Sequence, residues 1–136
     1  MFKYLLFISI IFFSFNNDKN HDNIIFETIG RGKNIDQARE NALENAFYQV
    51  LYRGIPNSYA NRPLINEKNI VNNSQKEFLK SFFELKYYKS FIISYRELDD
   101  VKKIKKGKEL RISIDINYLA LKKDLEINGI IRKFGY

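Results

Sequence analysis

The densest group of reactive side chains in this sequence is a run of lysines between Val101 and Lys108. Its members are Lys102, Lys103, Lys105, Lys106 and Lys108, and no acidic residue interrupts them. Closely spaced ammonium groups attract phosphates, anionic lipid head groups and acidic protein surfaces. Lysines on an edge strand also act simply by discouraging strand pairing between molecules. We prefer the edge-strand interpretation and keep an anion or partner contact as the alternative.

A second pattern, Gly30-x-Gly32, follows the β-favouring run Ile24–Ile29 and precedes a helix signal. Backbone N–H groups at the start of a helix can bind phosphate. The third glycine of G-x-G-x-x-G is absent, because position 35 is Ile, and no G-K-[ST] follows. We therefore predict a tight strand-to-helix turn at Gly30 and Gly32 and no phosphate site.

Residue types for catalysis or metal binding are sparse. The chain has no Cys, which excludes disulfides, thiol catalysis and thiolate metal sites, and its one His is His21. The one adjacent carboxylate pair, Asp99 and Asp100, stands near a predicted turn, whereas acid–base catalysis needs a positioned carboxyl with a shifted pKa. We expect no catalytic residue, no bound metal and no cofactor.

The first helix of the chain is predicted over about Ile35–Tyr52. Asn34 can cap it, with Gln37 three residues on, and Gly54 ends it. Its inner stripe repeats every four residues and consists of Ala38, Ala42, Ala46 and Val50. Alanines on this stripe would let the helix lie close to a sheet.

A second helix is predicted to start at Ser74, where Glu77 completes an S-x-x-E capping box. Its apolar face would consist of Phe78, Leu79, Phe82 and Leu85. The polar connection before it, Ile55–Asn73, is long for a compact domain. It is either a functional loop or a segment with a short turn of its own.

Two strands and a helix complete the pattern. Ser90–Leu98 favours a strand, and the alternation over Leu110–Ile116 indicates a second strand with one buried face. Gly107 suits the hairpin turn between them, and a last helix is predicted over about Tyr118–Asn128. The order strand, helix, helix, strand, strand, helix predicts an α+β domain, in which helices cover one face of a three-stranded antiparallel sheet.

The N-terminus has the pattern of an export signal. A basic start at Lys3 is followed by the apolar run Tyr4–Phe15 and then by a polar stretch. A run of this length matches a signal-peptide core and is shorter than the roughly 20 residues that span a bilayer. We predict a signal segment over 1–16, a polar disordered linker over 17–23 and one domain over 24–136. No small-x-small cleavage site is present, so export to the periplasm or cell envelope ends either in release or in an uncleaved N-terminal anchor.

The strand, the G-x-G and the alanine-spaced helix Asp36–Ala46 resemble the N-terminal domain of flagellar assembly protein T and related small bacterial envelope lipoproteins. The alternation over Ile112–Ile116, followed by Leu121 and Leu125, resembles the closing part of that pattern. The resemblance implies a non-catalytic envelope module that acts through protein contacts. The lipidated cysteine of those lipoproteins is absent here.

The element order also resembles a type I KH domain, which implies nucleic-acid binding as the alternative function. KH domains grip the nucleic-acid backbone with a G-x-x-G loop between their first two helices. The corresponding stretch here, Arg53–Asn73, offers Gly54 alone. Tyr87 and Tyr88 suit either a stacking platform or the core, and we expect the core.

The net charge of the chain indicates which class of partner it could bind. The formal charge is +7, and +6 remains without residues 1–16. Such a charge favours contact with anionic partners, but we prefer the simpler interpretation of a solvated basic surface. With an export signal in front, we expect a protein of the cell envelope as the main partner and weak contact with anionic surfaces, and keep nucleic acid only as the alternative partner. The sequence thus predicts an exported, non-catalytic interaction module.

Overall fold

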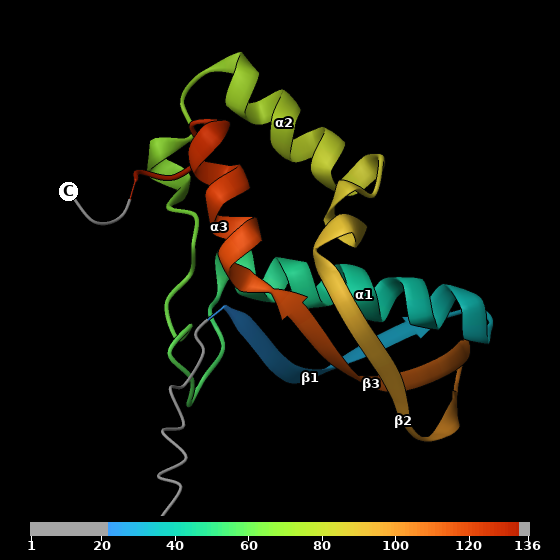
Figure 1. The fold of residues 1–136 in the computed structure, drawn as a ribbon. Helices are drawn as coiled ribbons and strands as arrows, with labels where there is room; N and C mark the ends of the chain where they lie inside the picture. Colours follow the sequence, from blue (N-terminus) through green and yellow to red (C-terminus); the bar gives the residue numbers. More distant parts are fainter. Residues whose placement is uncertain (1–21, 134–136) are drawn as a thin grey trace, which may run out of the picture.

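The computed structural model describes residues 22–133. The predicted signal segment, the linker up to residue 21 and the last three residues lie outside the described residues. In chain order (Figure 1) the elements are β1 (Asn23–Gly32), α1 (Ile35–Tyr52), the 3-10 helix η1 (Glu67–Asn69), α2 (Asn73–Glu84), the 3-10 helix η2 (Tyr87–Phe91), β2 (Ile92–Ile104), β3 (Gly107–Asn117) and α3 (Tyr118–Ile127). The predicted fold class and element order are confirmed.

The three strands form one antiparallel sheet in the order β1-β3-β2. The hairpin β2–β3 therefore places β3 at the centre, where its alternation buries one face. The buried side chains of β3 are Leu110, Ile112, Ile114 and Ile116. On β1 the buried partners include Phe26, which pairs with Ile114. β1 begins at Asn23, one residue before the predicted domain start, because Asn23 still pairs with Asn117.

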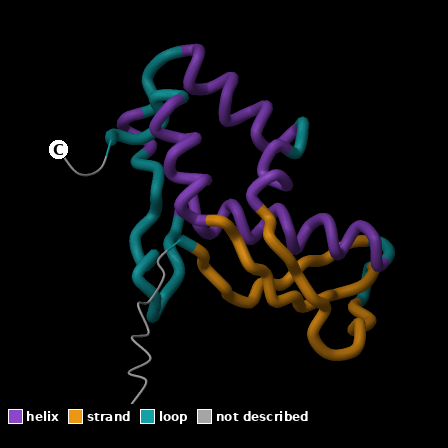
Figure 2. The backbone as a smooth tube through the Cα atoms, viewed as in Figure 1, coloured by secondary structure: helices purple, strands orange, loops and turns teal. Residues whose placement is uncertain are grey.

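Helices cover only the buried face of the sheet in the described part of the chain (Figure 2). α1 lies directly against β1 and β3 and buries its alanine stripe there, while α2 packs on the other side of α1. α3 starts beside the beginning of β1, where the Leu119 N–H donates to the Asp22 carbonyl over 2.9 Å. On the opposite sheet face, side chains such as Ile25 are exposed.

Gly30 and Gly32 do not form the strand-to-helix turn that was predicted for them. Both lie within β1, where they pair with Leu110 and Lys108, and the turn to α1 follows them. A Cβ on Gly30 would stand 2.1 Å from the Ala38 carbonyl oxygen of α1. The glycines are therefore required because the helix backbone rests on the strand, and the turn prediction was wrong about their role.

The start of α2 also differs from the prediction. The capping box consists of Asn72 and Gln75, not Ser74 and Glu77. The Gln75 N–H donates to Asn72 Oδ1 over 2.8 Å, and the Asn72 N–H donates back to Gln75 Oε1 over 3.1 Å. Gln75 Nε2 donates to the Gly129 carbonyl as well, so a contact with the end of α3 selects this cap over the equally plausible local one.

β2 is longer than predicted and starts later. Ser90 belongs to η2, and β2 continues past Leu98 through a bulge to Ile104. Asp99 has a φ of 55° in that bulge. The extension occurs because β3 offers partners as far as Gly107, so the hairpin turn falls on Lys105 and Lys106 instead of on Gly107.

The long connection between α1 and α2 contains a short turn of its own, η1, and is packed onto the domain. Ile55, Ala60 and Ile65 are buried. The Ile65 N–H donates to the Leu51 carbonyl over 2.9 Å, and the Tyr59 hydroxyl donates to the Asn23 carbonyl. Of the two alternatives for this connection, a functional loop or a segment with a short turn of its own, the second is therefore present. The segment closes one end of the core.

Of the two adjacent tyrosines, Tyr88 is buried and Tyr87 is exposed. The Tyr88 ring lies 5.1 Å from Phe47 and 6.2 Å from Phe82, centroid to centroid. The core prediction is therefore confirmed for Tyr88, and Tyr87 is not part of the core.

Burial raises the pKa of Tyr88 to about 12. In the unfolded chain a tyrosine titrates near about 10, so above that pH the unfolded state loses a proton that the folded state keeps. We expect stability to fall as the pH rises from 10 to 12, by up to about 1.4 kcal/mol per pH unit from this group. Urea unfolding of the wild type and of Tyr88→Phe at about pH 9 and about pH 11 measures this. An equal pH dependence in both proteins would contradict it.

Candidate functional site

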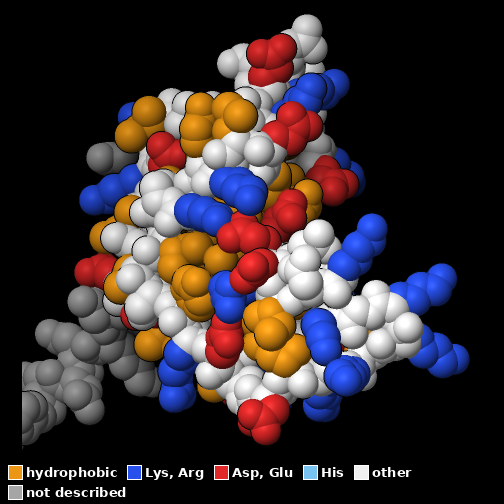
Figure 3. Space-filling view, turned by 90° about the vertical axis from the view of Figure 1, so that its right-hand side faces the viewer, with side chains coloured by type: hydrophobic (Ala, Val, Ile, Leu, Met, Phe, Trp, Pro, Cys, Tyr) orange, Lys and Arg blue, Asp and Glu red, His pale blue; other side chains and the backbone are white. Residues whose placement is uncertain are grey.

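The five predicted lysines gather at the tip of the β2–β3 hairpin. They are distributed over the end of β2, the turn and the start of β3, and the structure keeps them at the surface: Lys102, Lys103, Lys105 and Lys106 are exposed and Lys108 is half-buried. Within residues 22–133 none of their ammonium groups forms an ion pair. Figure 3 views the end of the molecule that carries this hairpin, and Lys and Arg side chains project from it.

Around the start of α1, the other feature singled out by the sequence, side chains accept hydrogen bonds from three backbone N–H groups. The Arg31 N–H donates to Asn41 Oδ1 over 2.9 Å, the Lys33 N–H to Gln37 Oε1 over 3.0 Å, and the Gln37 N–H to Asn34 Oδ1 over 2.9 Å. A phosphate would have to displace these side chains. That Gly30-x-Gly32 is not a phosphate site stays a prediction.

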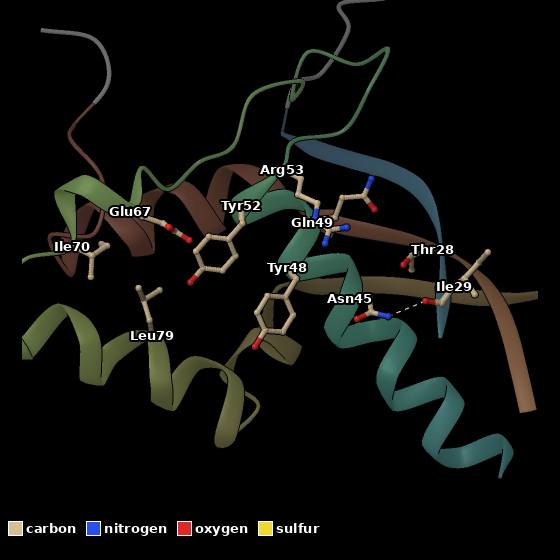
Figure 4. Close-up of a pocket in the computed structure, with 10 residues that line it drawn as sticks. All are labelled: Thr28, Ile29, Asn45, Tyr48, Gln49, Tyr52, Arg53, Glu67, Ile70 and Leu79. Carbon is tan, nitrogen blue, oxygen red and sulfur yellow. Dashed lines mark hydrogen bonds between the residues drawn. The ribbon is translucent and has the colours of Figure 1, made fainter. Parts of the chain in front are cut away.

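A groove of about 840 Å³, which the sequence did not indicate, opens among the described residues. It runs along the side of α1 that faces away from β3, between the edge of β1 and the pair α2 and η1 (Figure 4). Its lining consists of Thr28, Ile29, Asn45, Tyr48, Gln49, Tyr52, Arg53, Glu67, Ile70 and Leu79. We call this feature the α1 groove.

Aromatic rings form much of one wall of the α1 groove. Tyr48 stacks on Phe83 of α2, with centroids 4.0 Å apart and planes inclined by 10°, and lies 5.9 Å from Tyr52. Figure 4 shows both tyrosines projecting from α1 toward α2. Burial raises the pKa of each phenol. A neutral phenol can donate a hydrogen bond to a ligand.

Polar groups complete the groove. Asn45 Nδ2 donates to the Ile29 carbonyl over 2.9 Å, which ties α1 to the free edge of β1. Arg53 and Glu67 bring one positive and one negative charge, and neither forms an ion pair within the described residues. The groove thus combines apolar surface, amide and phenol hydrogen-bonding groups and both signs of charge.

One carboxylate in the described part of the chain, Asp115, is half-buried. Asp115 is the one carboxylate with a buried oxygen that lacks a hydrogen-bond partner there, and burial raises its pKa. It pairs across the sheet with Ile25 and Ser94, away from the α1 groove. No cluster of three or more metal-binding side chains occurs among residues 22–133, and no helix there is long and apolar enough to cross a membrane.

Comparisons with protein-family models, with curated proteins and with solved structures found no match to this chain.

Proposed function

We propose that this protein is a non-catalytic interaction module that holds a segment of a partner protein in the α1 groove. The observation that carries the proposal is the lining of that groove, in which tyrosines and aliphatic side chains alternate with amides and with an unpaired Arg53 and Glu67. Tyrosine and arginine are the residue types that contribute most to protein–protein recognition.

A peptide segment fits this lining for a chemical reason. Its backbone needs amide partners, which Asn45 and Gln49 supply, and its side chains need apolar surface, which Tyr48 and Leu79 supply. Arg53 and Glu67 would select charges of both signs along the segment. A nucleic-acid strand, in contrast, would meet a negative Glu67 in the groove.

Export to the periplasm or cell envelope belongs to the same proposal. Its support is the basic start, the apolar run Tyr4–Phe15 and the resemblance to the flagellar and lipoprotein envelope modules. The partner would then be a protein of the envelope or of the extracellular space. Recovery of the protein from the cytosol with an intact Met1 would contradict export and would leave the groove proposal standing.

A photo-reactive phenylalanine analogue in place of Tyr48 tests the groove in cells. Tyr95 on β2 is the matched control, because the two tyrosines are 42% and 43% exposed and Tyr95 does not line the groove. We expect one discrete cross-linked protein from position 48 and none from position 95. Mass spectrometry of the cross-link should map it to a single segment of the partner.

A synthetic peptide of that segment then measures affinity by fluorescence anisotropy. Arg53→Ala is expected to weaken binding about tenfold, as the loss of one arginine at an interface often does. Arg62→Ala, which removes an exposed arginine outside the groove, should leave the affinity unchanged. Equal labelling from positions 48 and 95, or equal affinities of the two arginine variants, would refute the groove as the binding site.

A further inference from the structure

A sixth lysine joins the five at the hairpin. Lys33, in the turn between β1 and α1, lies against Gly107, since a Cβ on Gly107 would stand 3.2 Å from the Lys33 Cα. We call the set Lys33, Lys102, Lys103, Lys105, Lys106 and Lys108 the lysine tip. No ammonium group of the lysine tip has an acidic partner within the described residues.

Edge protection, the interpretation that the sequence favoured, accounts for only part of the lysine tip. β2 is an edge strand, so Lys102 and Lys103 suit that purpose. Lys105 and Lys106 lie in the turn beyond the last strand pair. Lys108 is on the central strand β3, between Gly32 and Lys103, where no free edge exists.

The lysine tip also contains a repulsion between like charges, which destabilises the folded protein. Lys103 and Lys108 stand directly opposite each other in the hairpin, and like charges in that position destabilise a sheet. Two nearby acidic groups do not relieve it, because Glu109 is held by Arg31 at 2.8 Å and Asp99 pairs with Arg111. A third, Asp100, forms no ion pair with these lysines within the described residues. An external anion would relieve this repulsion.

The residue types of the lysine tip distinguish between nucleic acid and anionic lipid as the bound anion. Ile104 is 36% exposed among the lysines, and the stretch 101–108 contains no aromatic residue and no arginine. Binding of nucleic-acid strands relies on aromatic stacking platforms and on arginine. Membrane surfaces instead attract clustered lysines and take up an apolar side chain between the head groups.

We propose that the lysine tip binds anionic lipid head groups at a membrane surface. The tip and the α1 groove share no residue, so the protein can lie on a membrane and keep the groove accessible. This contact is independent of the proposed partner segment. It would hold the domain at the envelope surface whether or not the N-terminal segment is cleaved.

The test is co-sedimentation of the full chain with vesicles of phosphatidylcholine that contain about one third phosphatidylglycerol, compared with pure phosphatidylcholine. Each lysine at an anionic surface contributes about fivefold to partitioning, so Lys105→Gln with Lys106→Gln should reduce it about 25-fold. The control, Lys76→Gln with Lys80→Gln on α2, removes the same charge from exposed positions elsewhere and should change it less than about twofold. Circular dichroism checks that both variants fold.

Three results would overturn the proposal. They are equal binding to both kinds of vesicle, equal loss in the two double variants, and tip-dependent binding of a single-stranded oligonucleotide at low salt without vesicle binding. Ile104→Ser provides a further distinction. It should weaken vesicle binding several-fold, because the apolar contact is lost, whereas binding to an oligonucleotide would not change.

Discussion

Gly30→Ala is expected to destabilise the protein by about 3 kcal/mol, at the upper end of the usual cost of overpacking a core. The added methyl group would stand 2.1 Å from the Ala38 carbonyl oxygen and 2.3 Å from the Ala42 nitrogen. Both are backbone atoms, so no side-chain rotation can make room. α1 would have to lift off β1, and its hydrogen bond from Asn45 to the Ile29 carbonyl would lengthen with it.

Thermal and urea unfolding measure this loss, which corresponds to a fall in Tm of about 15 °C for a domain of this size. Gly129→Ala is the control, since it also replaces a glycine but meets no atom within 4 Å. Its φ of 70° should cost about 1 kcal/mol of backbone strain. If Gly30→Ala lost no more stability than Gly129→Ala, the close approach of helix and strand would not be required.

Phe82→Ala is expected to destabilise the protein by about 4 kcal/mol, as a fully buried aromatic side chain does when it is truncated. Phe82 is the one residue of α2 that is completely buried, and its ring lies 6.0 Å from Phe47 and 5.2 Å from Phe83. Loss of the ring would weaken the packing of α2 against α1 and leave the stack of Tyr48 on Phe83 as a remaining contact. Because Leu79 of α2 lines the α1 groove, the groove should lose one wall.

Amide hydrogen exchange locates the effect, and we expect α2 to lose protection before α1 and β3 do. Phe82→Leu keeps most of the volume and should lose only about 1 kcal/mol, which leaves a folded protein for the exchange measurement. Leu85→Ala, at the exposed C-cap of the same helix, should change stability by less than about 0.5 kcal/mol. The account would be contradicted if Phe82→Leu kept the wild-type stability and if the amides of its α2 were as protected from exchange as in the wild type.

The two proposed binding surfaces, for lipid and for a partner segment, lie at different places in the fold. The lysine tip lies on the β2–β3 hairpin and the neighbouring turn between β1 and α1, and the α1 groove is formed by β1, α1, η1 and α2. α1 connects them, because its first turn follows the loop that holds Lys33 and its last turns carry Tyr48 and Tyr52. Gly30→Ala should therefore disturb the groove as well as stability, whereas substitutions at the lysine tip should leave peptide binding intact.

Local patterns in the sequence determined the elements themselves. The bounds and cap of α1 were predicted correctly, because a side-chain cap at Asn34 and a four-residue repeat are properties of neighbouring residues. The alternation over Leu110–Ile116 likewise identified the buried face of β3. The alanine stripe even indicated that the helix would lie close to the sheet.

Contacts between distant segments decided the rest. The cap of α2 depends on Gly129, the length of β2 depends on its pairing with β3, and the need for Gly30 comes from the backbone of α1. The α1 groove combines residues as far apart as Thr28 and Leu79, and no periodicity records that they meet. Spacing along a chain specifies which face of an element is apolar. Packing of those faces decides which surfaces remain open to a partner.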